Sequence, residues 1–533
     1  MLDHPTPLII IARYKPRQRH SLLLPVVLSE QIVPGSFAFA LDYLVEHELD
    51  LKPMDAQFNN DEVSASAYDP RVMLKIVLLA YSQGMISSRT IEQACVRNVQ
   101  FIALSGDAQP SHAHIAKFVS RMGEQIKPLF AQVLMTCDAQ GLIGREMFAI
   151  DGVKLSSNAN KERSGTHDEL RHRADRLDRA ADKIIALHQS QDKNQDTPLD
   201  EHCAENTLSS KRQARTDALR KEAARTREFL ASTPKRLNKK GQELKTNITD
   251  PDSAKMATSK GVIQGYAAQA AVDSAHQIIL AAEVIGSGSE QTMLLPMIQQ
   301  TAPYRQEHTL VTADAGYHSD ANVTQLMEQG IAALIADPQM RKRDERMLGQ
   351  DKYKLKADPL HDKQAGSKDK IIQLYKPQDF KFNSDNTSTC PAGKTLHSSG
   401  TTHTTGRGHA YKLYTAKSDD CQHCLLRAKC LKSTNSKGAR QVTQFAPKVI
   451  NSNNPSERIR QAIDSDKGRQ LYSQRIGTVE PVFANIRHNK RLHRLNLRGI
   501  TKVNTQWILY CMVHNIEKLA KSDLGSKRGR YKQ

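Results

Sequence analysis

Two short apolar runs, far apart in the chain, each give way to an aspartate that is close to a glycine. Asp151 follows the run 147–150, and Asp314 follows the run 309–313. Apolar runs of this length with β-prone residues predict strands, and a glycine behind them predicts a turn. We expect each strand end to present its carboxylate to a cleft, although an isolated aspartate before glycine is more often only a turn residue.

Other segments extend this pattern into a fold class. Residues 148–151, 265–272, 278–284, 309–313 and 331–335 are β-like, and helical segments follow Glu290 and Asp320. Strands in succession, followed by alternating strands and helices, predict an α/β protein with a mixed sheet flanked by helices. Because 533 residues exceed one simple core, we expect two or more structural units.

The segment 36–136 is expected to be helical. Asp69-Pro70, Ser87-Ser88 and Pro110-Ser111 are typical helix starts, with a capping side chain or a first-turn proline. Three short helices with a tight turn suit a helix-turn-helix-like DNA-binding domain over 1–136, and a plain helical bundle almost as well. A second domain, 141–533, then holds the sheet.

Two stretches are expected to interrupt this second domain. In 160–250, apolar residues recur at helical 4-3-4-3 spacing, and a second basic helix stops before Pro234, which predicts a helical hairpin. The seam consists of Leu170, Ala174, Leu177, Ala181 and Ile184. The stretch 338–450 is polar and contains a cysteine cluster, which indicates loops around a small subdomain.

The cysteine cluster has the spacing of a metal site. Cys421 and Cys424 form a Cys-x2-Cys pair, with Cys390 before them and Cys430 after them. Thiolates at this spacing can share one tetrahedral zinc ion, with His423 as a substitute ligand. Ordinary reduced thiols and an iron–sulfur cluster are the alternatives.

The charge of the chain indicates a polyanion as its partner. Lys and Arg number 76 against 57 Asp and Glu, a net charge of +19. Such an excess favours nucleic acid over a merely soluble basic surface. The longest apolar run, 72–81, is interrupted by Lys75 and is far shorter than the roughly 20 residues that span a bilayer. With no cleavable leader at the N-terminus, a cytosolic protein is expected.

The C-terminal part carries a third acidic residue. After Pro455 we expect a helix to about Arg475, a break at Gly477 and a restart near Thr478, which puts Glu480 at the amino end of a helix. Arg487 lies two turns further along the same face, and Arg491 one turn beyond, so both can grip phosphate oxygens. In isolation, a glutamate followed by arginines is usually part of a solvent-exposed helix face. An apolar helix around Trp507 and a basic tail at 527–532 follow.

Together these motifs resemble bacterial insertion-sequence transposases of the DDE type, which have an RNase H-like catalytic core. Their last acid lies in a Tyr-x2-Arg-x3-Glu-x6-Lys signature, which Tyr472, Arg475 and Glu480 resemble. Two departures exist: four residues separate Arg475 from Glu480, and Arg487 replaces the lysine but keeps its charge. Segments 35–122, 265–273, 312–317 and 479–483 resemble the family's N-terminal domain, second strand, second-acid motif and third-acid motif.

The resemblance implies a mechanism and a set of partners. Asp151, Asp314 and Glu480 would hold two Mg²⁺ (or Mn²⁺) ions, which activate water to cut at the element's end and then the freed 3′-hydroxyl to attack target DNA. Tyr472, Arg475, Arg487 and Arg491 would contact DNA. The implied partners are double-stranded DNA, as terminal inverted repeats and target, and further copies of the chain in a homodimer or higher oligomer, near the bacterial nucleoid.

Two other functions stay open. A DNA-binding protein that has lost catalysis would keep the basic surface, and an RNase H-like nuclease would use the same metal site without joining strands. Other acids could also compete for a place in the site, although none combines a strand end with a family motif. They are Asp250, Asp252, Asp273 and Asp320.

Overall fold

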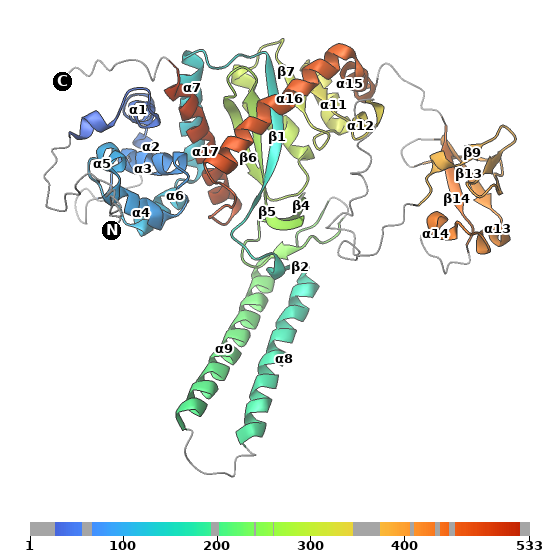
Figure 1. The fold of residues 1–533 in the computed structure, drawn as a ribbon, viewed down its shortest axis with the longest axis horizontal. Helices are drawn as coiled ribbons and strands as arrows, with labels where there is room; N and C mark the ends of the chain where they lie inside the picture. Colours follow the sequence, from blue (N-terminus) through green and yellow to red (C-terminus); the bar gives the residue numbers. More distant parts are fainter. Residues whose placement is uncertain are drawn as a thin grey trace, which may run out of the picture.

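The computed structural model describes most of the chain as three parts (Figure 1). It describes residues 27–55, 67–192, 202–238, 241–258, 261–344, 374–405, 410–431, 438–446 and 454–522. An α/β body carries a projecting helical hairpin, and a small β-rich subdomain is formed by residues 374–446. Among the helices of the described residues, none has the length and apolar character needed to cross a membrane. The expected basic tail at 527–532 lies outside the described residues.

The body is built on a mixed sheet, as the sequence predicts. Within the described residues its order is β4-β5-β1-β7-β8, with β6 also paired to β5. Strand β1 is antiparallel to β5 and parallel to β7, which is parallel to β8. The strands are β1 (Met147–Ser156), β4 (Ala254–Thr258), β5 (Gly261–Asp273), β6 (Ile279–Ile285), β7 (Leu310–Ala313) and β8 (Ala333–Ile335).

The expectation that Asp151 ends its strand is wrong. Strand β1 continues through Asp151 and Gly152 to Ser156, because β5 pairs with it over that whole length, from Phe148↔Asp273 to Ser156↔Gly265. Glycine therefore does not make a turn here. Asp314 does lie directly after its strand, β7, as expected.

Helices cover both faces of the sheet. On one face α16 (Asp466–Ala484) and α17 (Ile500–Ala520) cross β1, β5 and β6. Helix α10 (Leu294–Gln300) packs on β5 and β6 from the other face, and α11 (Asp320–Glu328) contacts α15 (Pro455–Asp464). The short α12 (Met340–Arg343) follows β8. Two α17 side chains accept hydrogen bonds from the β6 backbone: Asn515 from Ile279 N at 2.9 Å and Asn504 from Val284 N at 3.0 Å.

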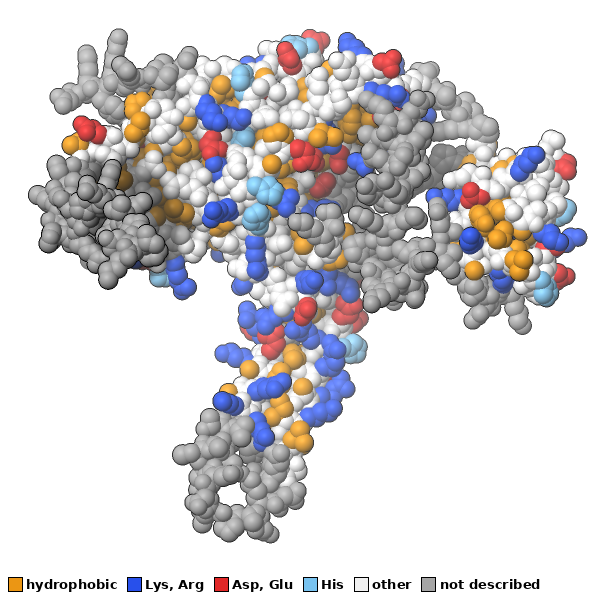
Figure 2. Space-filling model, in the orientation of Figure 1, with side chains coloured by type: hydrophobic (Ala, Val, Ile, Leu, Met, Phe, Trp, Pro, Cys, Tyr) orange, Lys and Arg blue, Asp and Glu red, His pale blue; other side chains and the backbone are white. Residues whose placement is uncertain are grey.

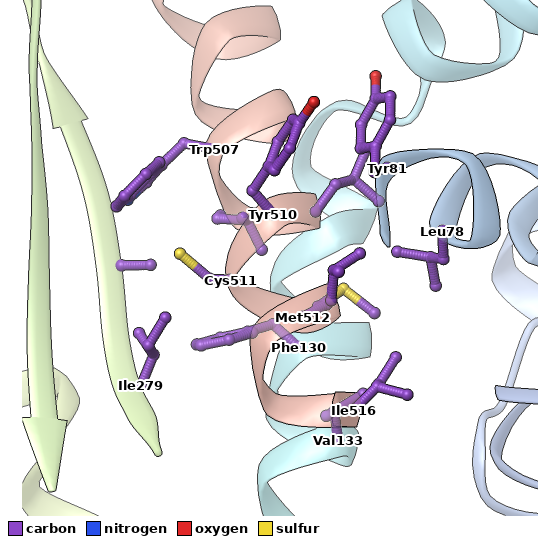
Figure 3. Close-up of a cluster of buried hydrophobic side chains, with 14 of the residues drawn as sticks. Leu78, Tyr81, Phe130, Val133, Ile279, Trp507, Tyr510, Cys511, Met512 and Ile516 are labelled. Carbon is purple, nitrogen blue, oxygen red and sulfur yellow. The ribbon is translucent and has the colours of Figure 1, made fainter. Parts of the chain in front are cut away.

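The N-terminal helices share one hydrophobic cluster with the sheet. Figure 3 shows α17 at its centre, with Trp507 and Ile279 on the sheet side and Tyr81 and Leu78 on the side of the N-terminal helices. The helices are α1 (Phe37–Tyr43), α2 (Lys52–Asp55), α3 (Pro70–Ser82), α4 (Ser88–Arg97), α5 (Val99–Ser105), α6 (His112–Arg121) and α7 (Ile126–Ala139). Packing is therefore continuous across the expected domain boundary at 136–141.

The capping residues expected at the helix starts are confirmed in part. The Asp69 carboxylate accepts from Arg71 N at 2.7 Å with Pro70 in the first turn, and Ser111 Oγ accepts from His114 N at 3.4 Å. Ser87 precedes α4 without a side-chain cap. Helix α5 was not expected, and its cap is the side chain of Asn98, which accepts from Gln100 N at 2.9 Å.

The expected helix break at Gly477 is also wrong. Helix α16 runs through Gly477 with Pro481 inside it, and a π-helical turn, Asn485–Asn489, follows. Proline has no N–H to donate to the carbonyl four residues earlier, which here belongs to Gly477. The Gln277 amide donates to that carbonyl instead, at 3.2 Å, so a side chain from the β5–β6 turn replaces the missing helical bond.

The expected helical hairpin is present between β1 and β4. Helices α8 (His167–Asp192) and α9 (His202–Ser232) pack side by side, and a two-stranded sheet, β2 (Ser164–Gly165) with β3 (Thr246–Asn247), closes its base. Arg227 pairs with Asp178 at 2.5 Å across the two helices. Figure 2 shows many Lys and Arg side chains along the exposed surface of this hairpin.

The β-rich subdomain has its own small core of Phe380, Leu396, Tyr414, Ala416 and Val442. Its sheet has the order β12-β13-β11-β10-β9, with β14 also paired to β13. The elements are β9 (Lys381–Phe382), β10 (Thr387–Thr389), β11 (Thr395–His397), β12 (Thr402–Thr404), β13 (Ala410–Ala416), α13 (Ser418–Gln422), α14 (Arg427–Cys430) and β14 (Gln441–Phe445).

One buried histidine makes the stability of the body depend on pH. His514 Nε2 donates to the Gln277 carbonyl at 2.9 Å, so Nδ1 is left to accept from the Asn485 amide at 3.1 Å, and the ring is neutral. Burial lowers the pKa of His514 from 6.5 to about 4. Between pH 6.5 and about 4, the unfolded chain therefore binds a proton at this histidine that the folded chain does not bind.

We therefore predict that the His514 contribution to the free energy of unfolding is constant above pH 6.5 and is lost as the pH falls toward 4. The loss should be about 3 kcal/mol at most. Urea unfolding at several pH values, followed by the fluorescence of Trp507, the single tryptophan, measures it. A His514→Gln variant should show a smaller pH slope than the wild type, and equal slopes would contradict the assignment.

Candidate active site

Asp151 lies in the middle of β1, where it is mostly buried and paired with an arginine. Its Oδ1 accepts from Gly152 N at 2.8 Å, and its Oδ2 accepts from Arg475 Nη1 on α16 at 2.6 Å. The two side chains are 17% and 11% exposed, so this ion pair is shielded from water. Burial raises the pKa of Asp151, and nearby Asp314 adds to that effect, while Arg475 and the Gly152 N–H oppose it.

Asp314 lies beside Asp151 because of the strand register. Ile150 of β1 pairs in parallel with Ala313 of β7, so the next residue on each strand is an aspartate. The Asp314 carboxylate accepts from Gly316 N at 2.8 Å, which fixes its orientation in the turn. The structure therefore brings together two acids that are 163 positions apart in the sequence.

A third carboxylate, Glu290, lies against the glycines that follow these aspartates. A Cβ built on Gly152 would lie 2.8 Å from Glu290 Oε1, and one built on Gly316 would lie 3.3 Å from Glu290 Oε2. Burial raises the pKa of Glu290, and the charges of Asp314 and Asp151 raise it further, against the lowering effect of Lys154. No pattern in the sequence pointed to Glu290, because it lies in a loop without a family motif.

Buried polar side chains surround the three acids. The Tyr317 hydroxyl donates to Gln269 Oε1, and both residues are fully buried. The amide nitrogen of Gln269 is fully buried, and a side-chain hydrogen bond with Gln269 lowers the pKa of Glu290. That nitrogen lies 2.4 Å from the position of a Cβ on Gly152, so it faces the same space as Glu290.

Glu480 lies elsewhere on the helix that contacts Asp151. It is exposed on α16, five residues after Arg475. In an α-helix five residues advance about 7.5 Å along the axis and turn well away from the starting side. Its expected position at a helix start is wrong, because α16 begins at Asp466. Within the parts of the chain that the structure describes, no three or more His, Cys, Asp or Glu side chains are grouped closely enough to hold a metal ion.

The residues expected to contact DNA have different surroundings. The Arg475 guanidinium lies 5.7 Å from the centre of the Tyr472 ring while it pairs with Asp151, so both residues belong to the acid pocket. Arg487 is half-buried, and its Nε has no hydrogen-bond partner among the described residues. Arg491 is exposed with a positive φ of 58°, and its stem lies against Gly84 of the N-terminal helical part.

The competing acids have structural partners. Asp250 accepts from the Tyr266 hydroxyl at 2.7 Å and from Gly499 N at 3.0 Å, and Asp252 accepts from Ile500 N at 2.8 Å. Asp273 accepts from three backbone N–H groups, and Asp320 accepts from Ser456 Oγ at 2.5 Å. These bonds hold turns and helix ends in place.

The four clustered cysteines line one small pocket of the β-rich subdomain. Cys390, Cys421, Cys424 and Cys430 all border it, and none of them is in a disulfide. Backbone N–H groups point at two of the sulfurs, from Lys394 to Cys390 Sγ at 3.3 Å and from Arg440 to Cys421 Sγ at 3.5 Å. His423 is exposed and does not border this pocket.

Two family models match the chain. One, described as Transposase domain (DUF772), matches residues 26–121, which form α1 to α6. The other, described as Transposase DDE domain, matches residues 389–520, from the cysteine-containing subdomain to the end of α17, and includes Glu480. No curated protein matches the chain.

The mixed α/β fold and both matches define a transposase, an enzyme of DNA transposition whose substrate is DNA. Both matches support a DDE-type transposase of an insertion sequence, as its motifs indicated. Asp151 and Asp314 lie outside the matched residues, so their part in the site rests on the register and contacts described above.

The packing around Gly152 predicts the effect of adding one methyl group there. Gly152→Ala should lower the free energy of unfolding by about 1–3 kcal/mol, because the new Cβ would overlap the side chains of Gln269 and Glu290. Gly477→Ala is the matched control. Open space surrounds Gly477 within α16, so alanine should raise stability there by up to about 1 kcal/mol. Urea unfolding of both variants tests the pair, and a harmless Gly152→Ala would contradict the described packing.

Proposed function

We propose that this transposase cuts DNA at the ends of its element and joins the freed ends to target DNA, at a carboxylate site around Asp151 and Asp314. The observation that carries the proposal is the parallel register of β1 and β7, which sets the two aspartates side by side. We propose Glu480 as the third acid of the site. It lies on α16, which contacts both β1 and β7. It would need to turn toward the pocket when substrate and cation bind.

The sheet supports this proposal as an RNase H-like core. Strands β6, β5 and β1 form an antiparallel series, and β7 and β8 continue it in parallel with β1. The hairpin α8–α9 and the subdomain of residues 374–446 are then insertions into this core, and the helices before α7 form the N-terminal domain.

The residues of the pocket suit a divalent cation such as Mg²⁺ or Mn²⁺. Hard cations prefer carboxylate oxygens, and Asp151, Asp314 and Glu480 are the residues that would hold them. Gly316 leaves the space beside Asp314 free of a side chain, since a Cβ there would lie 3.0 Å from Asp314 Oδ1. A bound cation lowers the pKa of coordinated water and stabilises charge on the transferring phosphoryl group.

Cleavage and strand transfer need no reactants other than water and the two DNA molecules. In cleavage, a water oxygen bonds to phosphorus while the bond from phosphorus to the 3′ oxygen of the element end breaks. The water gives up a proton, and the leaving 3′ oxygen takes one up. In strand transfer, that 3′-hydroxyl loses its proton and its oxygen bonds to a phosphorus of the target strand, from which a target 3′-hydroxyl leaves.

The chain's own basic residues would position the DNA. Arg491 is exposed and Arg487 half-buried after α16, and guanidinium groups bind phosphate oxygens in pairs of hydrogen bonds. Arg475 neutralises Asp151 from inside the pocket, with Tyr472 against it. The N-terminal helices would bind terminal-repeat duplex, and a homodimer or higher oligomer would hold two ends.

The Asp314→Asn variant tests the catalytic proposal. Wild-type protein with a duplex that carries the element's end, in Mg²⁺ or Mn²⁺, should give both cleaved and joined products. Asp314→Asn should lower both rates at least about 100-fold, because the asparagine side chain is a neutral, weaker ligand and several kcal/mol of stabilisation are lost. Labelled DNA on a denaturing gel measures both products.

Asp320→Asn is the control, since that side chain bonds Ser456 instead of the pocket. It should cut and join at the wild-type rate. Cleavage without joined products would favour a nuclease, and DNA binding without cleavage would favour a protein that has lost catalysis. Equal activity of Asp314→Asn and wild type would refute the assignment.

We also propose that the four clustered cysteines hold a structural zinc ion. They share one pocket, and two backbone N–H groups already point at sulfur atoms, an arrangement that stabilises thiolates. Cys430 is near the other three, whose charges raise its pKa in addition to burial, against the lowering effect of Arg440. Bound zinc would replace that repulsion with attraction.

Metal analysis of purified protein tests the zinc proposal. Zinc should be present in the wild type and lost from Cys424→Ser, because three thiolates hold zinc less well than four. His423→Ala should keep the zinc, since His423 is exposed and outside the pocket. Iron together with visible absorbance would indicate an iron–sulfur cluster instead of zinc. Wild-type protein without bound metal would indicate ordinary reduced thiols.

A further inference from the structure

The segment between the π-helical turn and α17 is held in place although it is neither helix nor strand. Leu492 and Leu495 are fully buried, and Leu495 N donates to the Ser156 carbonyl at the end of β1 at 2.8 Å. The Asn496 side chain donates to the Ile86 carbonyl of the N-terminal helical part at 3.2 Å. The segment is therefore fixed where the sheet meets the N-terminal helices.

Arginines flank these buried leucines and face the solvent. Arg491, Arg494 and Arg498 are all exposed. Arg494 Nε donates to the Ser157 carbonyl at 2.9 Å, with a longer contact of 3.5 Å from Nη2 to Asn158 Oδ1. Arg498 Nε donates to the Asn158 carbonyl at 2.8 Å. A guanidinium has five N–H donors, so the main chain after β1 orients both groups and leaves most of their donors for a ligand.

Acidic side chains do not neutralise this pair of arginines. Among the described residues neither Arg494 nor Arg498 forms an ion pair, whereas Arg227 on the hairpin pairs with two aspartates. One acid, Asp252, contacts the segment, and its carboxylate accepts from Ile500 N at 2.8 Å. Guanidinium groups that are oriented and lack an acidic partner suit phosphate oxygens, which they bind in pairs of hydrogen bonds.

The two arginines lie on the same side of the sheet as the Asp151 carboxylate. That carboxylate bonds Arg475 of α16, and the segment leads from the end of α16 into α17, which covers the same face. Six residues separate Asp151 from Ser157, a length of about 20 Å in an extended chain. One turn of B-form DNA is longer, about 34 Å. A duplex whose cut phosphate lies at Asp151 therefore has further phosphates within reach of Arg494 and Arg498.

We propose that Arg494 and Arg498 hold the sugar–phosphate backbone of double-stranded DNA within one helical turn of the cut. The inference rests on the proposed function for the position of the cut. It adds two phosphate contacts to those of Arg487 and Arg491. Because these contacts reach phosphates, they position the duplex without reading its sequence. Because both guanidinium groups are oriented before DNA arrives, binding costs little side-chain entropy.

DNA binding without cations tests the proposal. The double variant with Arg494→Gln and Arg498→Gln should bind a fluorescein-labelled duplex of mixed sequence at least about 10-fold more weakly than wild type, because hydrogen bonds to charged groups are lost. The slope of log affinity against log salt concentration should fall in magnitude by about 2, since two fewer phosphates are neutralised. Fluorescence anisotropy at several salt concentrations measures both. Wild-type affinity and slope in the double variant would overturn the proposal.

A charge-conserving variant separates phosphate binding from a structural role. The double variant with Arg494→Lys and Arg498→Lys loses the Nε bonds to the main chain but keeps both charges. Its salt slope should remain that of wild type. A slope reduced as much as in the glutamine variant would mean that the arginines act only by holding the segment, and it would overturn the proposal.

Arg305→Gln is the matched control for net charge. Arg305 also donates to a main-chain carbonyl, that of Ile298 at 3.4 Å, but it follows α10 on the opposite face of the sheet. This variant should bind DNA with the affinity and salt slope of wild type. A change per removed charge equal to that of the double glutamine variant would attribute the effect to net charge alone, and it would overturn the proposal.

Neutral linkages in the DNA locate the contact. A methylphosphonate replaces one charged phosphate oxygen by a methyl group, and it is placed at one phosphate at a time in a duplex that carries the element's end. At one or more positions within the first helical turn, it should weaken binding by wild type and leave binding by the double glutamine variant unchanged. Equal losses in both proteins at every position of that turn would overturn the proposal.

The outcomes separate this inference from the proposed function. Binding without cations requires no cleavage, so wild type that binds DNA through both arginines yet neither cuts nor joins it would refute the proposed function and leave the arginines as a DNA contact. Wild type that cuts and joins DNA, with a double glutamine variant that binds as tightly as wild type, would refute this inference alone.

Discussion

The parallel pairing of β1 with β7 is the constraint on which the site depends. Ile150 pairs with Ala313, so Asp151 and Asp314 meet although the hairpin and the three antiparallel strands β4, β5 and β6 lie between them in sequence. A slip of one residue would turn Asp151 to the other face of the sheet, because side chains alternate along a strand. The antiparallel pairing of β1 with β5 over nine residue pairs holds that register.

Helix α17 links this sheet to the N-terminal helices. Trp507 donates to the Gln269 carbonyl at 3.0 Å, while Tyr510 stacks on Tyr81 of α3 at 4.6 Å between ring centres (Figure 3). The same strand residue, Gln269, contributes its side chain to the acid pocket. The segment that matches the transposase domain (DUF772) is therefore packed on the mixed sheet through one buried helix, and a change in that packing would reach the residues around Gln269.

The pocket itself concentrates negative charge with little compensation. Arg475 is bonded to Asp151, and Asp314 and Glu290 lie nearby with raised pKa values at Asp151 and Glu290, caused first by burial. Arg475 and the Gly152 N–H lower the pKa of Asp151, and Lys154 lowers that of Glu290, so these groups oppose the effect of burial. The matched DDE segment carries Glu480 and Arg475, whereas the aspartates come from an earlier part of the chain, so the site forms only when distant segments fold together.

The sequence by itself indicated most of the element types and the transposase family, and it named Asp151 and Asp314 as candidates, because strand periodicity, helix caps and short motifs are local properties. It also indicated the hairpin, whose apolar spacing is that of a helix. Tertiary structure decided that β1 continues past Asp151, since only pairing with β5 extends it, and that α16 passes through Gly477, since Gln277 from another element bonds the carbonyl that Pro481 leaves free. It also placed Glu290 against Gly152 and Gly316, because a loop glutamate acquires its neighbours only from segments that are far away in sequence.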